Sequence, residues 1–236
     1  MIKLKYSDIL KLNKELGNSC TSGSYDITVL SNVIVHQIKE ILEYLLRDKG
    51  INANVEIGNF DNIVQDSLKY KEANEIIIFW ELSNLIDGLQ YKIELLNNEQ
   101  VDEILEKTKY EICLVLKNLE KTSLVLINKF TSLPFSSSNI RKNKLDALAQ
   151  KLNHYLKENI PSNVKLVELD KVIANVGISK SLDLRYYYSS KALYSVDFFK
   201  AYANYIKPFI LSPLGKAKKA LIFDCDNTLW KGILGE

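Results

Sequence analysis

The sequence is poor in cysteine and histidine and contains no long apolar run. Its 236 residues include only three cysteines and two histidines. Cys20, Cys113 and Cys225 lie far apart and form no Cys-x-x-Cys pair. An odd and sparse set of cysteines argues against a disulfide framework and against a zinc site, and it favours a reducing compartment.

An excess of charge of one sign is also missing. The formal net charge of +2 arises from 31 basic and 29 acidic residues, so nothing indicates nucleic acid or a membrane surface as a partner. No stretch approaches the roughly 20 apolar residues that span a bilayer, and residues 1–17 lack the apolar core of a signal peptide. We therefore expect a cytoplasmic location. The composition, 47% hydrophobic and 25% charged, is that of a globular protein with a substantial core.

Strand-like and helix-like segments alternate along the chain. Apolar runs or period-two patterns predict strands over 26–30, 51–57, 76–80, 124–127 and 164–169. Apolar residues at helical spacing predict helices over 7–16, 34–45, 61–70, 99–121, 145–156 and 195–210, which places both His36 and His154 on helices. Ser7 is the expected N-cap of the first helix, and Gly17 is expected to end it.

This alternation predicts an α/β fold with a three-layer, flavodoxin-like, doubly wound parallel sheet. The expected organisation is an N-terminal arm over 1–24, the α/β domain over 25–210, a linker over 211–219 and the start of a second domain over 220–236. The aromatic residues of the last predicted helix have helical spacing, so most of them are expected in the core or at a domain interface, although a docking face for a carrier protein is an alternative.

Two aspartates follow an apolar run near the end of the sequence. Ala220 to Phe223 predict a buried strand that delivers Asp224 and Asp226 at its end, with Thr228 two residues later. A carboxylate at a strand end can attack phosphorus when Mg²⁺ screens the charge, and a second carboxylate can protonate the leaving oxygen. The alternative is an Asx turn in which the carboxylates satisfy backbone donors.

The segment FDCDNTLW resembles motif I, D-x-D-x-T, of the HAD phosphatase superfamily, and the longer DCDNTLWKGILGE resembles the FkbH-like branch, HAD subfamily IIIC. The resemblance implies Asp224 as nucleophile and Asp226 as general acid and base, both as Mg²⁺ ligands. It places Cys225, Asn227 and Thr228 in the substrate or phosphate site. Cys225 is either a small buried hydrophobe or the carrier of an acyl thioester.

Most of the remaining sequence is similar to the N-terminal domain of FkbH-like proteins, which resembles the SGNH-hydrolase fold. By this resemblance Ser31 and Asn32 follow the first strand, Gly58 matches the oxyanion glycine, Asn84 belongs to the third block and Asp183 to the last. The last block has Tyr186 where the family pattern has histidine, so we expect no active serine site. The vestigial pocket either binds a partner or ligand, or belongs to a plain scaffold.

These patterns predict the N-terminal part of an FkbH-like phosphatase or acyl (glyceryl) transferase. It would act on a phosphorylated small molecule with Mg²⁺ through an aspartyl-phosphate, in polyketide or surface-glycan type biosynthesis, with an acyl carrier protein as a candidate partner. The sequence holds HAD motif I but not the later motifs, so we expect it to be inactive alone. The alternative is a non-catalytic SGNH-like binding or scaffold domain that carries only a remnant of the HAD site.

Overall fold

The structure is a computed structural model, and it describes residues 4–19, 23–135 and 143–216. It separates into two compact units, residues 1–206 and residues 207–236. The first unit contains the sheet and the candidate site, and it is described by itself below.

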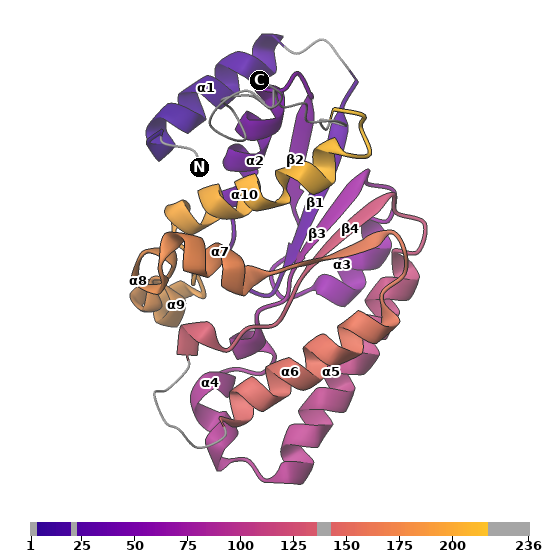
Figure 1. Cartoon of the computed structure of the whole chain (residues 1–236), viewed down its shortest axis with the longest axis vertical. Helices are drawn as coiled ribbons and strands as arrows, with labels where there is room; N and C mark the ends of the chain where they lie inside the picture. Colours follow the sequence, from indigo (N-terminus) through magenta and orange to yellow (C-terminus); the bar gives the residue numbers. More distant parts are fainter. Residues whose placement is uncertain (1–3, 20–22, 136–142, 217–236) are drawn as a thin grey trace, which may run out of the picture. The chain divides into compact units, whose positions relative to one another are not determined.

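Five parallel strands form one sheet at the centre of this unit (Figure 1). They are β1 (Tyr25–Ser31), β2 (Ala53–Ile57), β3 (Glu75–Phe79), β4 (Leu124–Asn128) and β5 (Val164–Val167). Their spatial order is β2-β1-β3-β4-β5, and every neighbouring pair is parallel. This is the flavodoxin-like doubly wound order, so the predicted fold class is confirmed.

Ten α-helices are described. They are α1 (Tyr6–Ser19), α2 (Ile38–Arg47), α3 (Ile63–Lys69), α4 (Leu89–Lys92), α5 (Asn98–Asn118), α6 (Lys144–Asn159), α7 (Leu169–Val176), α8 (Ile178–Ser181), α9 (Leu184–Ser190) and α10 (Val196–Leu211). Short 3₁₀ turns lie at Leu82–Asn84, Ile93–Leu95 and Leu133–Phe135. Asn97 and Gln100 form a capping box at the start of α5, where each side chain accepts a hydrogen bond from the other residue's backbone N–H.

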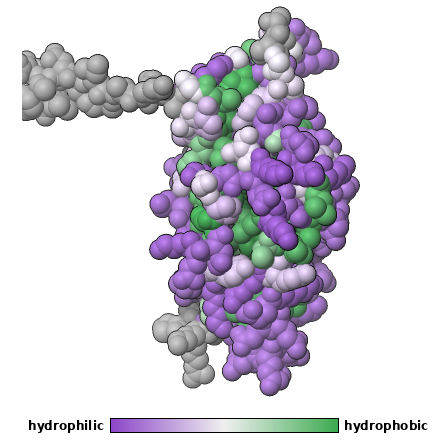
Figure 2. All heavy atoms as spheres, turned by 90° about the vertical axis from the view of Figure 1, so that its right-hand side faces the viewer, coloured by the Kyte–Doolittle hydropathy of each residue, from purple (hydrophilic) through white to green (hydrophobic). Residues whose placement is uncertain are grey.

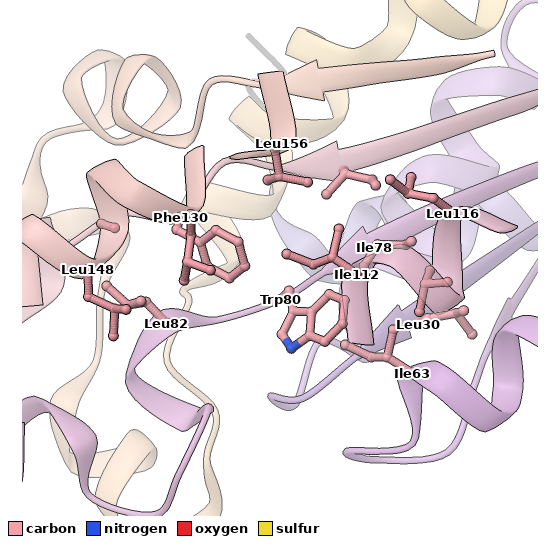
Figure 3. Close-up of a cluster of buried hydrophobic side chains, with 14 of the residues drawn as sticks. Leu30, Ile63, Ile78, Trp80, Leu82, Ile112, Leu116, Phe130, Leu148 and Leu156 are labelled. Atoms are coloured by element: carbon pink, nitrogen blue, oxygen red, sulfur yellow. The ribbon is translucent and has the colours of Figure 1, made fainter. Parts of the chain in front are cut away.

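The two faces of the sheet bury different side chains. On one face, aliphatic residues of β1, β3 and β4 pack against α3, α5 and α6, and Figure 3 shows Leu30, Ile78 and Ile112 in this cluster. On the other face, Phe79 of β3 contacts four aromatic rings, those of Tyr194, Phe198, Phe199 and Tyr202. All five of these aromatic side chains are buried, so the expected place of this cluster in the core is confirmed.

The N-terminal helix α1 packs against α2. Asn13 donates to Glu43 at 2.8 Å, and Arg47 donates both to Asn13 and to the carbonyl oxygen of Ala53. The prediction that Gly17 ends the helix is wrong, because α1 continues to Ser19. A side chain at Gly17 would meet the Arg47 guanidinium at 3.0 Å, so the glycine permits a close approach rather than a stop.

Three other boundaries differ from the predictions. The last strand ends at Val167, and Leu169 begins α7, because an apolar run does not distinguish a strand from the buried face of the helix that follows it. His36 lies in the turn before α2 and not on a helix. The sequence also predicts that the last helix ends near Pro208, but this proline lies inside α10, which continues to Leu211.

Hydrophilic residues predominate on the face drawn in Figure 2, and hydrophobic ones appear between them. Within the described ranges, no helix combines the length and the apolar character needed to cross a bilayer.

Candidate functional site

The aspartate motif lies outside the described residues. This holds for Asp224, Cys225, Asp226, Asn227 and Thr228 and for the whole predicted second domain, 220–236. Their roles remain predictions from the sequence. Two neighbouring carboxylates suit Mg²⁺, which prefers oxygen ligands. In the part of the chain that the structure describes, no cluster of three or more His, Cys, Asp or Glu side chains is arranged to hold a metal ion.

Ser31 ends β1, but its hydroxyl group is already engaged with its own turn. Oγ donates to the carbonyl oxygen of Val33 at 2.7 Å and accepts from the N–H of Val33 at 3.0 Å. Ser31, Gly58 and His36 line a small pocket of about 30 Å³. No described hydrogen bond joins His36 to Ser31. A nucleophilic serine needs a base to take its proton, and Ser31 has none in this arrangement.

Asn32 occupies the next position and joins two strand ends. Its Oδ1 accepts from the N–H of Glu81 at 2.6 Å, and its Nδ2 donates to the carbonyl oxygen of Glu81 at 3.0 Å. Asn84 donates in turn to the carbonyl oxygen of Asn32 at 2.6 Å. The predicted residues Asn32 and Asn84 are therefore brought together, and their amides connect the end of β1 with the turn after β3.

Gly58 follows β2, and its place leaves no room for a side chain. A Cβ atom there would lie 2.8 Å from Oδ2 of Asp66 and 2.8 Å from Cδ2 of Leu30. The buried Asp66 carboxylate accepts hydrogen bonds from the backbone N–H of Asn59 and from the side-chain amides of Asn59 and Asn62. The glycine thus lets the loop after β2 close over the end of β1.

Asp183, the fifth residue of the predicted vestigial site, has a structural role. Its carboxylate accepts from the N–H groups of Arg185 at 3.1 Å and Tyr186 at 3.3 Å, which makes it the N-cap of α9. Tyr186, which stands where the family pattern has histidine, is an exposed residue. Neither residue supplies the Asp–His pair that a serine hydrolase requires.

A buried hydrogen-bond network surrounds Glu81 and Ser83 in the turn after β3. The Glu81 carboxylate accepts from the hydroxyl groups of Tyr194 at 2.6 Å and Ser83 at 3.1 Å. Tyr187 donates to Oγ of Ser83 at 3.0 Å. Burial raises the pKa of Glu81, although these donors oppose the rise. The network ties the turn after β3 to α9 and to the segment before α10, so it holds Asn84 in place.

A pocket of about 210 Å³ lies beside this network. It opens between the ends of β1 and β3 and the helices α3 and α5, which is the switch point where ligands bind in open α/β sheets. The lining residues with polar or ionisable side chains are Asn32, Asp61, Gln65, Trp80, Asn84, Lys107 and Glu111.

Asp61 stands at this pocket in a left-handed backbone conformation, with φ of 54°. Its N–H donates to the carbonyl oxygen of Ser31 at 3.0 Å, so the end of β1 fixes its position. Partial burial raises the pKa of Asp61, and the charges of Lys107 and Lys191 oppose that rise. Aspartate and asparagine tolerate this conformation better than most residues, and such strain is concentrated at functional sites.

The sequence did not single out Asp61, Trp80, Lys107 or Glu111. They come from three segments that are distant in sequence, and only the strand order places them around one cavity. The one local signal was the Asn59-Phe60-Asp61-Asn62 stretch, whose composition is typical of a turn.

Solved structures share this fold at low sequence identity. The N-terminal part of the protein BF1531 from Bacteroides fragilis, which contains a phosphatase domain and was crystallised with Mg, matches 99% of this chain with a TM-score of 0.76 and 18% identity. The chain spans 63% of that structure's length.

Two hydrolases are also similar. A lipase from a goat rumen metagenome matches 77% of this chain and 95% of its own (TM-score 0.57, 12% identity). An acetyl xylan esterase from Geobacillus stearothermophilus matches 84% of this chain and 97% of its own (TM-score 0.51, 10% identity). The described domain therefore has the fold of SGNH-like hydrolases and of a phosphatase-domain protein's N-terminal part. No protein-family model matches the sequence, and neither does any curated protein.

Proposed function

We propose that the chain is the N-terminal part of an FkbH-like enzyme that removes or transfers a group from a phosphorylated small molecule with Mg²⁺. The observation that carries this proposal is the motif FDCDNTLW, with Asp224 as nucleophile and Asp226 as general acid and base. The match of nearly the whole chain to a structure that contains a phosphatase domain supports it. The proposed setting is polyketide or surface-glycan type biosynthesis in the cytoplasm.

Phosphate release from a panel of phosphorylated three-carbon acids and sugars tests this proposal. The protein is assayed at the length its native host makes. We expect turnover that requires Mg²⁺ and that falls more than about a hundredfold in Asp224→Asn and in Asp226→Asn, because each removes a reacting carboxylate. Asp48→Asn, a matched change at a surface ion pair, should leave turnover unchanged. Equal turnover in the wild type and in Asp224→Asn would overturn the proposal.

Acyl transfer is the finer form of this proposal. Cys225 lies between the two aspartates. Its thiolate would attack the carbonyl carbon of an acyl phosphate and release phosphate, and the thiol of an acyl carrier protein would then displace Cys225 and take the acyl group. The test is the mass of the carrier protein after incubation with enzyme and substrate. Cys225→Ser should abolish the mass increase on the carrier while phosphate release continues. Full transfer by Cys225→Ser would refute the thioester role.

A second function is proposed for the described domain by itself, namely non-hydrolytic binding or scaffolding. The observation in its favour is that Ser31 is hydrogen-bonded within its own turn while Asp183 caps a helix. We expect no esterase activity on p-nitrophenyl acetate above that of a Ser31→Ala variant, and no labelling of Ser31 by a fluorophosphonate. Labelling at Ser31 would show an active serine and would exclude this reading.

A further inference from the structure

The pocket between β1, β3, α3 and α5 presents polar groups that are accessible to a ligand. Trp80 is only 6% exposed and packs beside Ile63 and Ile112 (Figure 3). Its indole nitrogen points away from these two residues in Figure 3. This nitrogen is not among the fully buried atoms of the described residues that lack a partner, and no hydrogen bond from it is described, so its N–H is accessible. A donor is therefore available at this pocket.

Asn84 supplies an acceptor to the same pocket. The residue is 9% exposed, and its Nδ2 is committed to the carbonyl oxygen of Asn32 at 2.6 Å. This hydrogen bond fixes the orientation of the amide, because the acceptor requires the nitrogen on that side. Oδ1 accepts no hydrogen bond from the residues described. This oxygen is not among the fully buried unpartnered atoms of the described residues, so it is accessible to a ligand or to water.

Asp61, an exposed residue at the mouth of the pocket, adds a carboxylate that makes no hydrogen bond or ion pair with the described part of the chain. Its backbone N–H is fixed by Ser31, so the left-handed conformation is imposed by the loop. Across the pocket, Lys107 lies 3.8 Å from the carboxylate of Glu111 on the next turn of α5. The three ionisable groups that line the pocket carry one net negative charge. A phosphate or carboxylate ligand would be repelled by this charge.

We propose that this pocket binds one neutral polyhydroxyl group, a monosaccharide unit or a small polyol. A hydroxyl group both donates and accepts, so it can accept from Trp80 and donate to Asn84 and Asp61 at the same time. The volume of about 210 Å³ lies below the roughly 300–1,000 Å³ of drug-sized sites, which restricts the ligand to about one sugar ring. This inference rests on the proposed role of the domain in binding rather than hydrolysis.

Ligand-observed NMR with four probes tests the inference. D-glucose and glycerol represent the proposed class, inorganic phosphate represents an anion, and ethanolamine represents a cation. We expect the full-length protein to bind at least one neutral probe at millimolar concentration. We expect it not to bind phosphate at this pocket. Binding of phosphate or ethanolamine without either neutral probe would overturn the inference, and so would no binding by any probe.

Two variants locate the binding. Trp80→Phe keeps the aromatic packing but removes the N–H, and Asp61→Asn keeps a residue that tolerates the left-handed conformation but removes the charge. Each should weaken the neutral probe about threefold to tenfold, which corresponds to one lost hydrogen bond. Glu120→Gln, the same change of charge at an exposed position, should bind like the wild type.

The outcomes separate this inference from the phosphatase proposal. Asp224→Asn should lose phosphate release and keep sugar binding, because Asp224 is not among the residues that line the pocket. Unchanged binding in both Trp80→Phe and Asp61→Asn would refute the pocket assignment whatever the turnover. A lowered Tm of Trp80→Phe would mean that this variant can lose binding through loss of stability. In that case the binding measured for Asp61→Asn decides whether the pocket assignment holds.

Discussion

Replacing Glu75 by glutamine should remove much of the pH dependence of the stability of this domain. Glu75 begins β3 and is completely buried. Its Oε2 accepts from the Tyr25 hydroxyl at 3.4 Å, and its Oε1 has no partner among the described residues. Burial raises the pKa of Glu75 from 4.5 to about 8, and the hydrogen bond from Tyr25 only partly opposes this rise.

The direction of the effect follows from proton linkage. In the folded protein Glu75 holds its proton up to about pH 8, whereas in the unfolded chain it loses the proton near pH 4.5. The folded state therefore binds more protons between these two values, so stability falls as the pH rises through this window. Where the folded state binds one more proton than the unfolded chain, the free energy of unfolding falls by about 1.4 kcal/mol for each pH unit. Between about pH 5 and about pH 8 the loss from this one carboxyl is about 3 to 4 kcal/mol.

The assay is urea unfolding at a series of pH values for the wild type and for Glu75→Gln. Other groups titrate similarly in both proteins, so the difference between the two curves isolates Glu75. We expect the wild type to lose about 3 kcal/mol or more of unfolding free energy relative to the variant over this window. Glu72→Gln, at an exposed glutamate nearby in sequence, should follow the wild-type curve. Parallel curves for the wild type and Glu75→Gln would refute the reasoning.

Three further substitutions test other contacts by urea unfolding. Gly58→Ala should lower the free energy of unfolding by about 1–3 kcal/mol, because the new Cβ would lie 2.8 Å from Asp66 and from Leu30. Gly23→Ala, which has open space around it, should change this free energy little. Asn97→Ala should lower the free energy of unfolding by about 1 kcal/mol, because it removes the capping box of α5. An unchanged free energy of unfolding would mean that water replaces the cap. Tyr194→Phe should lower the free energy of unfolding by about 1–3 kcal/mol, because it removes a hydrogen-bond donor from the buried Glu81 carboxylate. The decrease should be larger at high pH, where Glu81 is ionised. An equal decrease for Tyr186→Phe, at an exposed tyrosine, would contradict this prediction.

The sheet was the most predictable part of the structure. Ile76 to Phe79 and Leu124 to Ile127 are apolar without interruption, and a strand covered on both faces requires this pattern. Leu169 was misassigned because an apolar residue after Val167 fits the end of a strand as well as the start of α7. Gly17 was misassigned because the space that it leaves is used by Arg47, a contact that no local pattern reveals.

The candidate site was less predictable than the sheet. The resemblance of the sequence to the SGNH pattern indicated Ser31, Asn32, Gly58 and Asn84, and the structure brings them to the same end of the sheet. It did not indicate that Asp183 serves as a helix cap. Asp61 and Trp80 were missed because their importance arises from what surrounds them in three dimensions and from their lack of partners.

The strand order also has a consequence for how the chain folds as it is synthesised. β1 lies at the interior of the sheet between β2 and β3, so it pairs on both sides with strands that follow it within about fifty residues. The first three strands can therefore assemble while the later part of the chain is still being made. β4 and β5 then extend the sheet in one direction only, each beside the strand just completed. This growth moves one edge of the sheet from β3 to β4 and then to β5. The β3–β4 pairing that is added later is as non-local as the β1–β3 pairing, because Glu75 and Leu124 are 49 positions apart and Ile27 and Glu75 are 48 positions apart.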